Sequence, residues 1–181
     1  MFEFTLNNKK VIAKENKKLL PFLREDMNIT SVKNGCSEGA CGTCMVIVDG
    51  QAKKACVLTT AKLVGKNIIT IEGLSERERD VYAYAFSSQG AVQCGFCIPG
   101  MVISAKALLD VNNDPSEDEI KKALRGNICR CTGYVKIFKA IELAAKIFRE
   151  NIEVPKVECK GLIGESMPRV DAVAKALGEA E

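Results

Sequence analysis

Eight of the nine cysteines in this 181-residue chain fall into two sets of four. In the first set, Cys36, Cys41 and Cys44 follow the order C-x4-C-x2-C, and Cys56 comes after eleven intervening residues. Three thiolates from one loop and a remote fourth thiolate are typical of a plant-type [2Fe-2S] site. The first set therefore predicts an iron-sulfur cluster and one-electron transfer.

The second set consists of Cys94 and Cys97, spaced C-x2-C, and Cys129 and Cys131, spaced C-x-C. Taken alone, this spacing is also compatible with a structural zinc ion. A zinc knuckle is less suited to the first set, because zinc sites usually combine two short C-x2-4-C hairpins. The chain has no histidine, which excludes histidine-containing zinc sites, Rieske-type ligation and histidine general bases.

Four disulfides in a secreted protein are the alternative use of these cysteines. The N-terminal residues 1–10 lack the apolar core of a signal peptide, and the cysteines form close pairs beside glycines. The apolar run 91–109 is interrupted by Gln93, Pro99-Gly100 and Lys106, which argues against a membrane span. We therefore expect a cytoplasmic protein with reduced thiols and no membrane insertion.

The formal net charge of +3 gives little support to nucleic-acid binding. Two oxidised clusters with their thiolates would bring the loaded protein to about −1. The lysine pairs are scattered along the chain, as expected for solvated surfaces. No nucleic-acid partner is expected.

Residues 1–74 are predicted to form a small domain with a mixed sheet. Alternating apolar residues in 2–6, the Asn7-Asn8 turn and the apolar run 11–13 predict a hairpin, and 19–23 has helical spacing. Strands are expected at 45–49 and 52–57, around Asp49-Gly50, with a closing strand at 68–71. A mixed sheet crossed by one helix is similar to the β-grasp fold of plant-type ferredoxins.

Residues 75–151 are predicted to be helical, with helices at roughly 76–88, 98–110, 116–125 and 133–149. Ser75 with Glu78, and Ser116 with Glu119, are capping-box patterns. The second and fourth helices each follow a cysteine pair and a glycine. Because helix N-termini stabilise anions, we expect one cluster between these two N-termini. The fold class is thus α+β, followed by an irregular linker or docking arm at 152–181.

Two longer motifs carry a resemblance to a known family. Residues 91–101 read A-V-Q-C-G-F-C-I-P-G-M, and residues 126–134 read G-N-I-C-R-C-T-G-Y. Both are similar to signatures of the iron-sulfur portion of the molybdenum hydroxylases, the family of xanthine dehydrogenases and aldehyde oxidoreductases. The resemblance covers about residues 1–150. It implies a distal cluster on the first cysteine set, in the β-grasp domain, and a proximal cluster on the second set, nearer molybdenum.

The resemblance also implies that Gln93 and Cys131 contact the pterin of a molybdopterin cofactor, which is expected in its cytosine dinucleotide form. Residues 163–172, I-G-E-S-M-P-R-V-D-A, resemble the start of the molybdenum-binding portion. The implied partners are a molybdenum-binding subunit or a C-terminal continuation of this chain, and a flavin subunit with FAD. Cys159 has no cysteine left to pair with and is expected to be a bystander.

The predicted function is that of an electron-transfer module without catalytic residues of its own. It would relay single electrons from the molybdopterin centre through two [2Fe-2S] clusters to a flavin or another acceptor. The whole enzyme would hydroxylate a purine or another N-heterocycle, or oxidise an aldehyde. The alternatives are a free-standing ferredoxin-type electron carrier and a zinc-stabilised interaction module.

Overall fold

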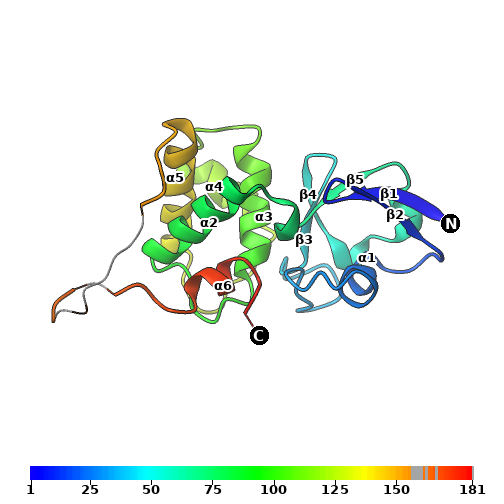
Figure 1. Cartoon of the computed structure of the whole chain (residues 1–181), viewed down its shortest axis with the longest axis horizontal. Coiled ribbons are helices and arrows are strands. Elements are labelled where there is room, and N and C mark those ends of the chain that lie inside the picture. Colours follow the sequence, from blue (N-terminus) through cyan, green and yellow to red (C-terminus); the bar gives the residue numbers. More distant parts are fainter. Residues whose placement is uncertain (156–160, 162, 166, 181) are drawn as a thin grey trace.

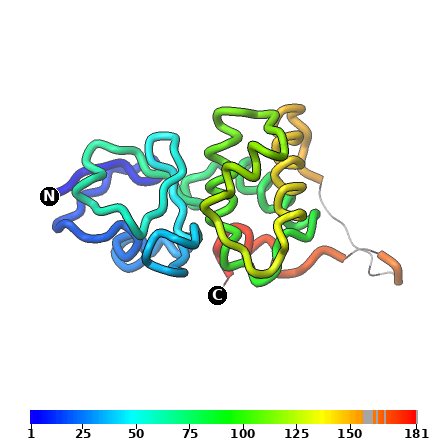
Figure 2. Tube along the Cα trace, turned by 180° about the vertical axis from the view of Figure 1, so that it is seen from behind, coloured from blue at the N-terminus to red at the C-terminus, as the bar shows by residue number. Residues whose placement is uncertain are grey.

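The computed structural model describes residues 1–155, 161, 163–165 and 167–180. The first part is a sheet with a short helix, and the second part is a bundle of helices beside it (Figure 1). Seen from behind, the C-terminal stretch returns to the helical part after leaving it (Figure 2). Cys159 lies outside the described residues, so the expectation for its thiol stays a prediction.

The sheet has five strands in the order β2-β1-β5-β3-β4. The strands are β1 (Phe2–Leu6), β2 (Lys9–Ala13), β3 (Met45–Val48), β4 (Gln51–Lys54) and β5 (Asn67–Ile69). The sheet is mixed, because β1 and β5 are parallel whereas the other neighbours are antiparallel. Asn7 and Asn8 both have positive φ, as a tight hairpin turn between β1 and β2 requires.

The helix predicted at 19–23 is present but changes character after its first turn. It begins as α1 (Leu19–Pro21) and continues as a π-helical turn, Phe22–Asp26, closed by the Met27 N–H on the Phe22 carbonyl. Phe22 packs edge-on against Phe4 of the sheet, with ring centroids 5.7 Å apart. These aromatic and aliphatic side chains form a core separate from that of the helical part.

The prediction of a strand at 52–57 is wrong for residues 55–57. β4 ends at Lys54, and residues 55–57 form a 3-10 turn instead. The strand expected at 68–71 likewise ends at Ile69, followed by a 3-10 turn over Ile71–Gly73. The physical reason at 55–57 is that Cys56 must turn inward toward the first cysteine loop, where it is buried.

The helical part contains α2 (Glu76–Ser88), α3 (Ile98–Leu109), α4 (Glu117–Ala123) and α5 (Val135–Arg149). Both predicted capping boxes are present, Ser75 with Glu78 and Ser116 with Glu119. Tyr82 of α2 is buried against Phe148 of α5, with ring centroids 5.5 Å apart. Among the described helices, none combines the length and the apolar composition needed to cross a membrane.

The C-terminal stretch is not an irregular arm throughout, as the sequence predicted. Residues Ala172–Ala176 form a short helix, α6, which packs against α2 and α3 (Figure 1). Ala172, Ala176 and Leu177 are buried there. A five-residue helix is too short to show an amphipathic repeat, so the sequence pattern alone did not reveal it.

Where the two parts meet, backbone packs directly on backbone. α3 lies against β3 and β4. A Cβ on Gly100 would lie 2.5 Å from the Gly42 carbonyl oxygen, and a Cβ on Gly42 would lie 2.2 Å from the Gly126 carbonyl oxygen. The buried Asn127 amide donates to the Gly42 carbonyl at 3.1 Å and accepts from the Ser104 hydroxyl at 2.8 Å. The absence of side chains at these glycines therefore allows the junction to close.

Replacing Gly100 by Ala tests this junction. Removing a glycine from a helix normally adds up to about 1 kcal/mol of stability. Here the new methyl group meets backbone atoms that have little freedom to move, so we expect a loss of about 1–3 kcal/mol. Gly126→Ala is the matched control, because its Cβ would meet side-chain atoms at 3.4 Å or more. Urea unfolding that shows Gly100→Ala to be as stable as Gly126→Ala would contradict this packing.

Candidate metal centres

The first cysteine loop runs from Cys36 to Cys44, between the π-helical turn and β3. The Cys41 backbone N–H points to the Cys36 sulfur, 3.4 Å away, and the Thr43 hydroxyl lies 3.3 Å from the Cys41 sulfur. Lys54 of β4 donates to the carbonyls of Gly39 and Ala40, at 2.7 and 3.2 Å. The loop is thus held by the sheet edge while its N–H groups face the sulfur atoms.

The four thiols of this set have contrasting environments. Hydrogen bonds from backbone N–H groups, first that of Cys41, lower the pKa of Cys36 to about 6. Burial raises the pKa of Cys44 to about 11, and a hydrogen bond with the Cys56 thiol adds to the increase. A thiolate at Cys44 therefore needs a bound cation to be stable, as expected of a metal ligand.

The second set joins two loops of the helical part. Cys94 and Cys97 precede α3, and Cys129 and Cys131 precede α5, so the two loops before these helices meet as the sequence predicts. The sulfur atoms of Cys94 and Cys131 are 3.6 Å apart and exposed. Cys97 and Cys129 are buried and lie within hydrogen-bonding distance of each other.

Neighbouring groups tune the two buried thiols in opposite directions. Burial raises the pKa of Cys97, and the charge of Cys129 contributes to the increase. Burial also acts to raise the pKa of Cys129, but the Thr132 hydroxyl, which donates to its sulfur at 3.1 Å, and nearby backbone donors outweigh burial and lower it. The Tyr134 hydroxyl accepts from the Cys129 N–H at 2.9 Å and fixes this loop further.

In both sets the thiols are arranged as two pairs. The close pairs are Cys36 with Cys41, Cys44 with Cys56, Cys94 with Cys131, and Cys97 with Cys129. A zinc site needs four ligands around one ion, whereas a [2Fe-2S] cluster takes two protein ligands on each iron. The donor sets therefore fit a binuclear cluster better than zinc.

The two cysteine loops also contact each other. The Ile128 N–H, next to Cys129, donates to the Cys41 carbonyl at 2.9 Å. A ligand candidate of the first set is thus connected to one of the second set by a single hydrogen bond and a few covalent bonds. Such a short connection suits electron transfer between two sites.

Gln93, singled out in the sequence, is exposed next to Cys94, and no hydrogen bond of its side chain to another described residue is present. Three residues important here were not predicted from the sequence: Lys54, Asn127 and Tyr134. Asn127 and Tyr134 lie within the motif 126–134, so their presence there was a usable signal. Nothing in the sequence distinguishes Lys54 from the other lysines.

Two cavities adjoin the cysteine sets. One of about 500 Å³ lies beside the first set, and its lining includes Cys56, Lys18 and Arg24. Another of about 330 Å³ lies beside the second set and is lined by Cys94, Phe96 and residues of the C-terminal segment.

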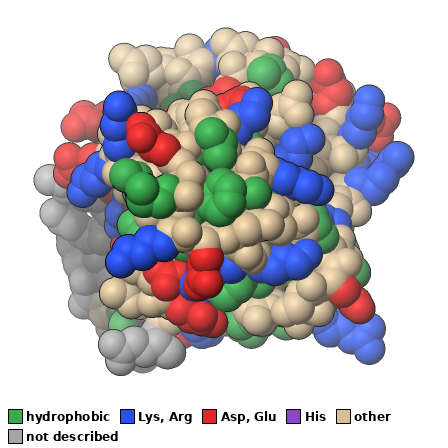
Figure 3. All heavy atoms as spheres, turned by 90° about the vertical axis from the view of Figure 1, so that its right-hand side faces the viewer, with side chains coloured by type: hydrophobic (Ala, Val, Ile, Leu, Met, Phe, Trp, Pro, Cys, Tyr) green, Lys and Arg blue, Asp and Glu red, His purple; other side chains and the backbone are tan. Residues whose placement is uncertain are grey.

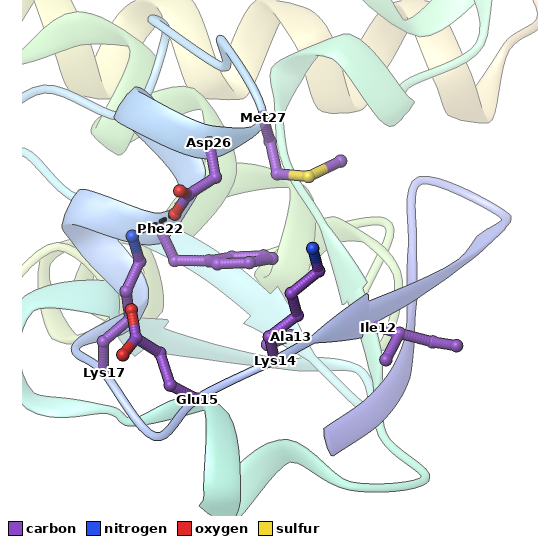
Figure 4. A pocket seen from close by; sticks show the side chains of 8 residues that line it. All are labelled: Ile12, Ala13, Lys14, Glu15, Lys17, Phe22, Asp26 and Met27. Carbon is purple, nitrogen blue, oxygen red and sulfur yellow. Dashed lines mark ion pairs between the residues drawn. The ribbon is translucent and has the colours of Figure 1, made fainter. Parts of the chain in front are cut away.

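A third cavity, of about 350 Å³, lies in the sheet part near the end of β2 and is lined by no cysteine (Figure 4). Lys17 and Asp26 form an ion pair on its wall. The outer face of the sheet part carries intermixed hydrophobic, basic and acidic side chains (Figure 3). We assign no site to this end of the molecule.

Two family models match consecutive parts of the chain. One, described as a 2Fe-2S iron-sulfur cluster binding domain, matches residues 6–81. The other, described as a [2Fe-2S] binding domain, matches residues 70–142. Together they cover both cysteine sets.

Among proteins of known role, the chain is similar to the nicotinate dehydrogenase small FeS subunit of Eubacterium barkeri. The identity is 47% over 137 residues, which are 75% of this chain and 87% of that subunit. Among solved structures it is similar to the aldehyde oxidoreductase of Desulfovibrio desulfuricans, with 38% identity and a TM-score of 0.89. That match covers 99% of this chain but only 21% of the longer enzyme.

A further solved structure, quinoline 2-oxidoreductase from Pseudomonas putida 86, matches with 36% identity and a TM-score of 0.73. The match covers 82% of this chain and 95% of the matched chain. These neighbours confirm the predicted α+β fold and the predicted electron-transfer role. The chain belongs to the iron-sulfur subunits and N-terminal regions of the molybdenum hydroxylases, the family that includes xanthine dehydrogenases and aldehyde oxidoreductases.

Proposed function

We propose that the eight paired cysteines hold two [2Fe-2S] clusters. The distal cluster is assigned to Cys36, Cys41, Cys44 and Cys56, and the proximal cluster to Cys94, Cys97, Cys129 and Cys131. The observation that carries the assignment is the arrangement of each set as two thiol pairs. When bound, the clusters supply one-electron oxidation and reduction. The two sites correspond to domains at 1–74 and 75–151, with an arm at 152–181.

The residues of this chain provide position and charge balance. Backbone N–H groups and the Thr132 hydroxyl direct positive dipoles at the sulfur atoms and so favour the more negative, reduced state of a cluster. The hydrogen bond between Ile128 and Cys41 keeps the two sites close. The close contacts of the glycines at the junction leave no space for a side chain between the two sites.

We infer that electrons enter at the proximal side, from a molybdopterin cofactor in a molybdenum-binding portion. Gln93, which directly precedes Cys94, and Cys131, whose sulfur lies 3.6 Å from that of Cys94, are both exposed and therefore accessible to a cofactor outside this chain. The cofactor is expected in its cytosine dinucleotide form. The molybdenum-binding portion is either a separate subunit or a C-terminal continuation of this chain.

Electrons leave from the distal side to an acceptor, which we propose is FAD in a flavin subunit or another redox protein. Two basic residues, Lys18 and Arg24, and one acidic residue, Glu25, line the cavity beside Cys56, and this basic excess suits a partner with acidic groups around its redox centre. The whole enzyme would work in the cytoplasm. It would hydroxylate a purine or another N-heterocycle, or oxidise an aldehyde. The relatives are parts of larger enzymes, which favours this function over a free ferredoxin.

Metal and sulfide analysis of anaerobically purified protein tests the proposed function. Two binuclear clusters predict about four irons and four acid-labile sulfides per chain. The protein should also be red-brown. Zinc in place of iron, with negligible sulfide, would contradict the proposal and favour a zinc-stabilised module instead.

Replacing Gln93 by Ala tests the entry side. All eight cysteines remain, but a hydrogen bond to the cofactor is lost, which costs about 0.5–1.5 kcal/mol if the bond is neutral. In the assembled enzyme, cofactor retention or the rate at which substrate reduces the clusters should fall, while the cluster spectra stay unchanged. Gln51→Ala, at an exposed glutamine of β4, is the matched control. Full cofactor occupancy and an unchanged reduction rate would show that Gln93 is a bystander.

A further inference from the structure

Residues 169–180, which we call the docked segment, lie against both parts of the iron-sulfur body. The segment includes α6, which packs on α2 and α3 close to where the sheet part and the helical part meet (Figure 1). Ala176 is 0% exposed, whereas Val173 of the same helix is 49% exposed. The segment therefore buries Ala172, Ala176 and Leu177 against the iron-sulfur body.

Polar contacts fasten the segment at both ends. The Arg169 guanidinium donates to the Val92 carbonyl at 3.2 Å, and Glu179 forms an ion pair with Arg79 of α2. Lys33 of the sheet part donates to the Gly178 carbonyl at 3.1 Å. The segment thus bridges the domain of the distal cluster and the domain of the proximal cluster.

The segment also contacts the loop between Cys94 and Cys97. Gly95 lies in this loop, and a Cβ on Gly95 would lie 2.6 Å from the Lys175 Cβ. At the other end of α6, a Cβ on Gly178 would lie 2.6 Å from the Ser31 Cα and 3.1 Å from a ring carbon of Pro99. Pro99 is in the first turn of α3, two residues after Cys97. Close packing of this kind leaves the loop little room to change shape.

The receiving surface is connected to the stretch that joins the two parts. The Ser31 hydroxyl donates to Glu72 at 2.8 Å, and Glu72 also accepts from the Thr70 hydroxyl at 2.5 Å. The Thr70 backbone N–H donates to the Asn7 side chain at 2.9 Å. The segment therefore rests on groups that are themselves held by the sheet.

The docked segment also forms part of the wall of the cavity beside Cys94. Its wall combines the sheet part, the proximal loop and the docked segment: Arg24, Lys33, Cys94, Gly95, Phe96, Lys175, Gly178 and Ala180. Release of the segment would remove three of these residues and open the cavity to water beside a proposed cluster ligand.

The two solved relatives match different shares of this chain. The solved aldehyde oxidoreductase covers 99% of this chain, so it includes a counterpart of the docked segment. The solved quinoline 2-oxidoreductase chain covers 82% of this chain and is itself covered to 95%. The number of residues of this chain left unmatched is close to the length of the stretch that follows α5.

We propose that the surface around Gly95, Pro99, Ser31, Lys33 and Arg79 is a docking site for residues 169–180. Docking holds the loop from Cys94 to Cys97 in the shape that binds the proximal cluster. Attachment of the C-terminal segment therefore slows iron loss from the proximal cluster and leaves the distal cluster unaffected. The partner that fits the site is a short helix with small buried side chains, a basic residue before it and an acidic residue after it. This proposal rests on the proposed assignment of the second cysteine set as cluster ligands.

Two substitutions on α6 in the full, cluster-loaded chain test the proposal. Ala176→Glu places a charge on the buried face and should release the segment, because burying an unpaired charge is costly. Val173→Glu places the same charge at a half-exposed position of α6 and should leave docking unchanged. For Ala176→Glu we expect amide hydrogen exchange of residues 172–178 to accelerate about tenfold or more. Two of the four irons should also pass faster to a chelator, while the other two keep their rate.

Addition of a synthetic peptide of residues 167–180 to the Ala176→Glu chain should restore slow iron release, since the docking site is then free to accept it. A peptide of the same composition in scrambled order should have no effect. Lys33→Gln, which removes one tether from the receiving side, should show a weaker form of the same change and covers the case that Ala176→Glu does not fold.

Three results would overturn the inference: faster exchange of the segment with unchanged iron release, equal effects of the two glutamate substitutions, or acceleration at all four irons together. Failure of the proposed function is distinguishable from these, because the unmodified chain would then contain no iron and sulfide.

Discussion

The contact between the two cysteine loops is the constraint on which the rest of the structure depends. It is made of backbone: the Cys41 carbonyl accepts from the Ile128 N–H, and Gly42 lies where any side chain would overlap the Gly126 carbonyl. Asn127, buried between them, satisfies the Gly42 carbonyl with its amide. Because these bonds join the sheet part to the helical part, the separation of the two cysteine sets is fixed by the same groups that fix the domain junction.

The thiols explain why this fold needs its cofactors. Burial raises the pKa of Cys44 and of Cys97, so neither is a stable thiolate in the protein without a bound cation. The sheet part and the helical part have separate hydrophobic cores. Metal binding at the junction of these two small domains would therefore add to the free energy of folding. The helical part contributes the N-terminus of α3 beside Cys97, in keeping with the favourable field for an anionic cluster there.

The sequence predicted the elements that depend on local chemistry. The two capping boxes, the Asn7-Asn8 hairpin and the four helices of the second part follow from residue types at short spacing, and the motifs 91–101 and 126–134 led to the family. What it did not predict depends on tertiary contacts. The 3-10 turn at 55–57 exists because Cys56 faces the cysteine loop, and α6 is helical because a surface far away in sequence receives it. Likewise, Lys54 holds the loop only because β4 is the neighbouring sheet edge.

The central claim is that each domain holds its own binuclear cluster, and electron paramagnetic resonance of the reduced protein tests it most directly. Cys41→Ser changes one ligand of the first set, and Cys97→Ser changes one ligand of the second set. The reduced protein should show two distinct signals; Cys41→Ser should remove or perturb one signal, and Cys97→Ser the other. Loss of both signals from either substitution, in a protein that remains folded, would contradict two independent sites.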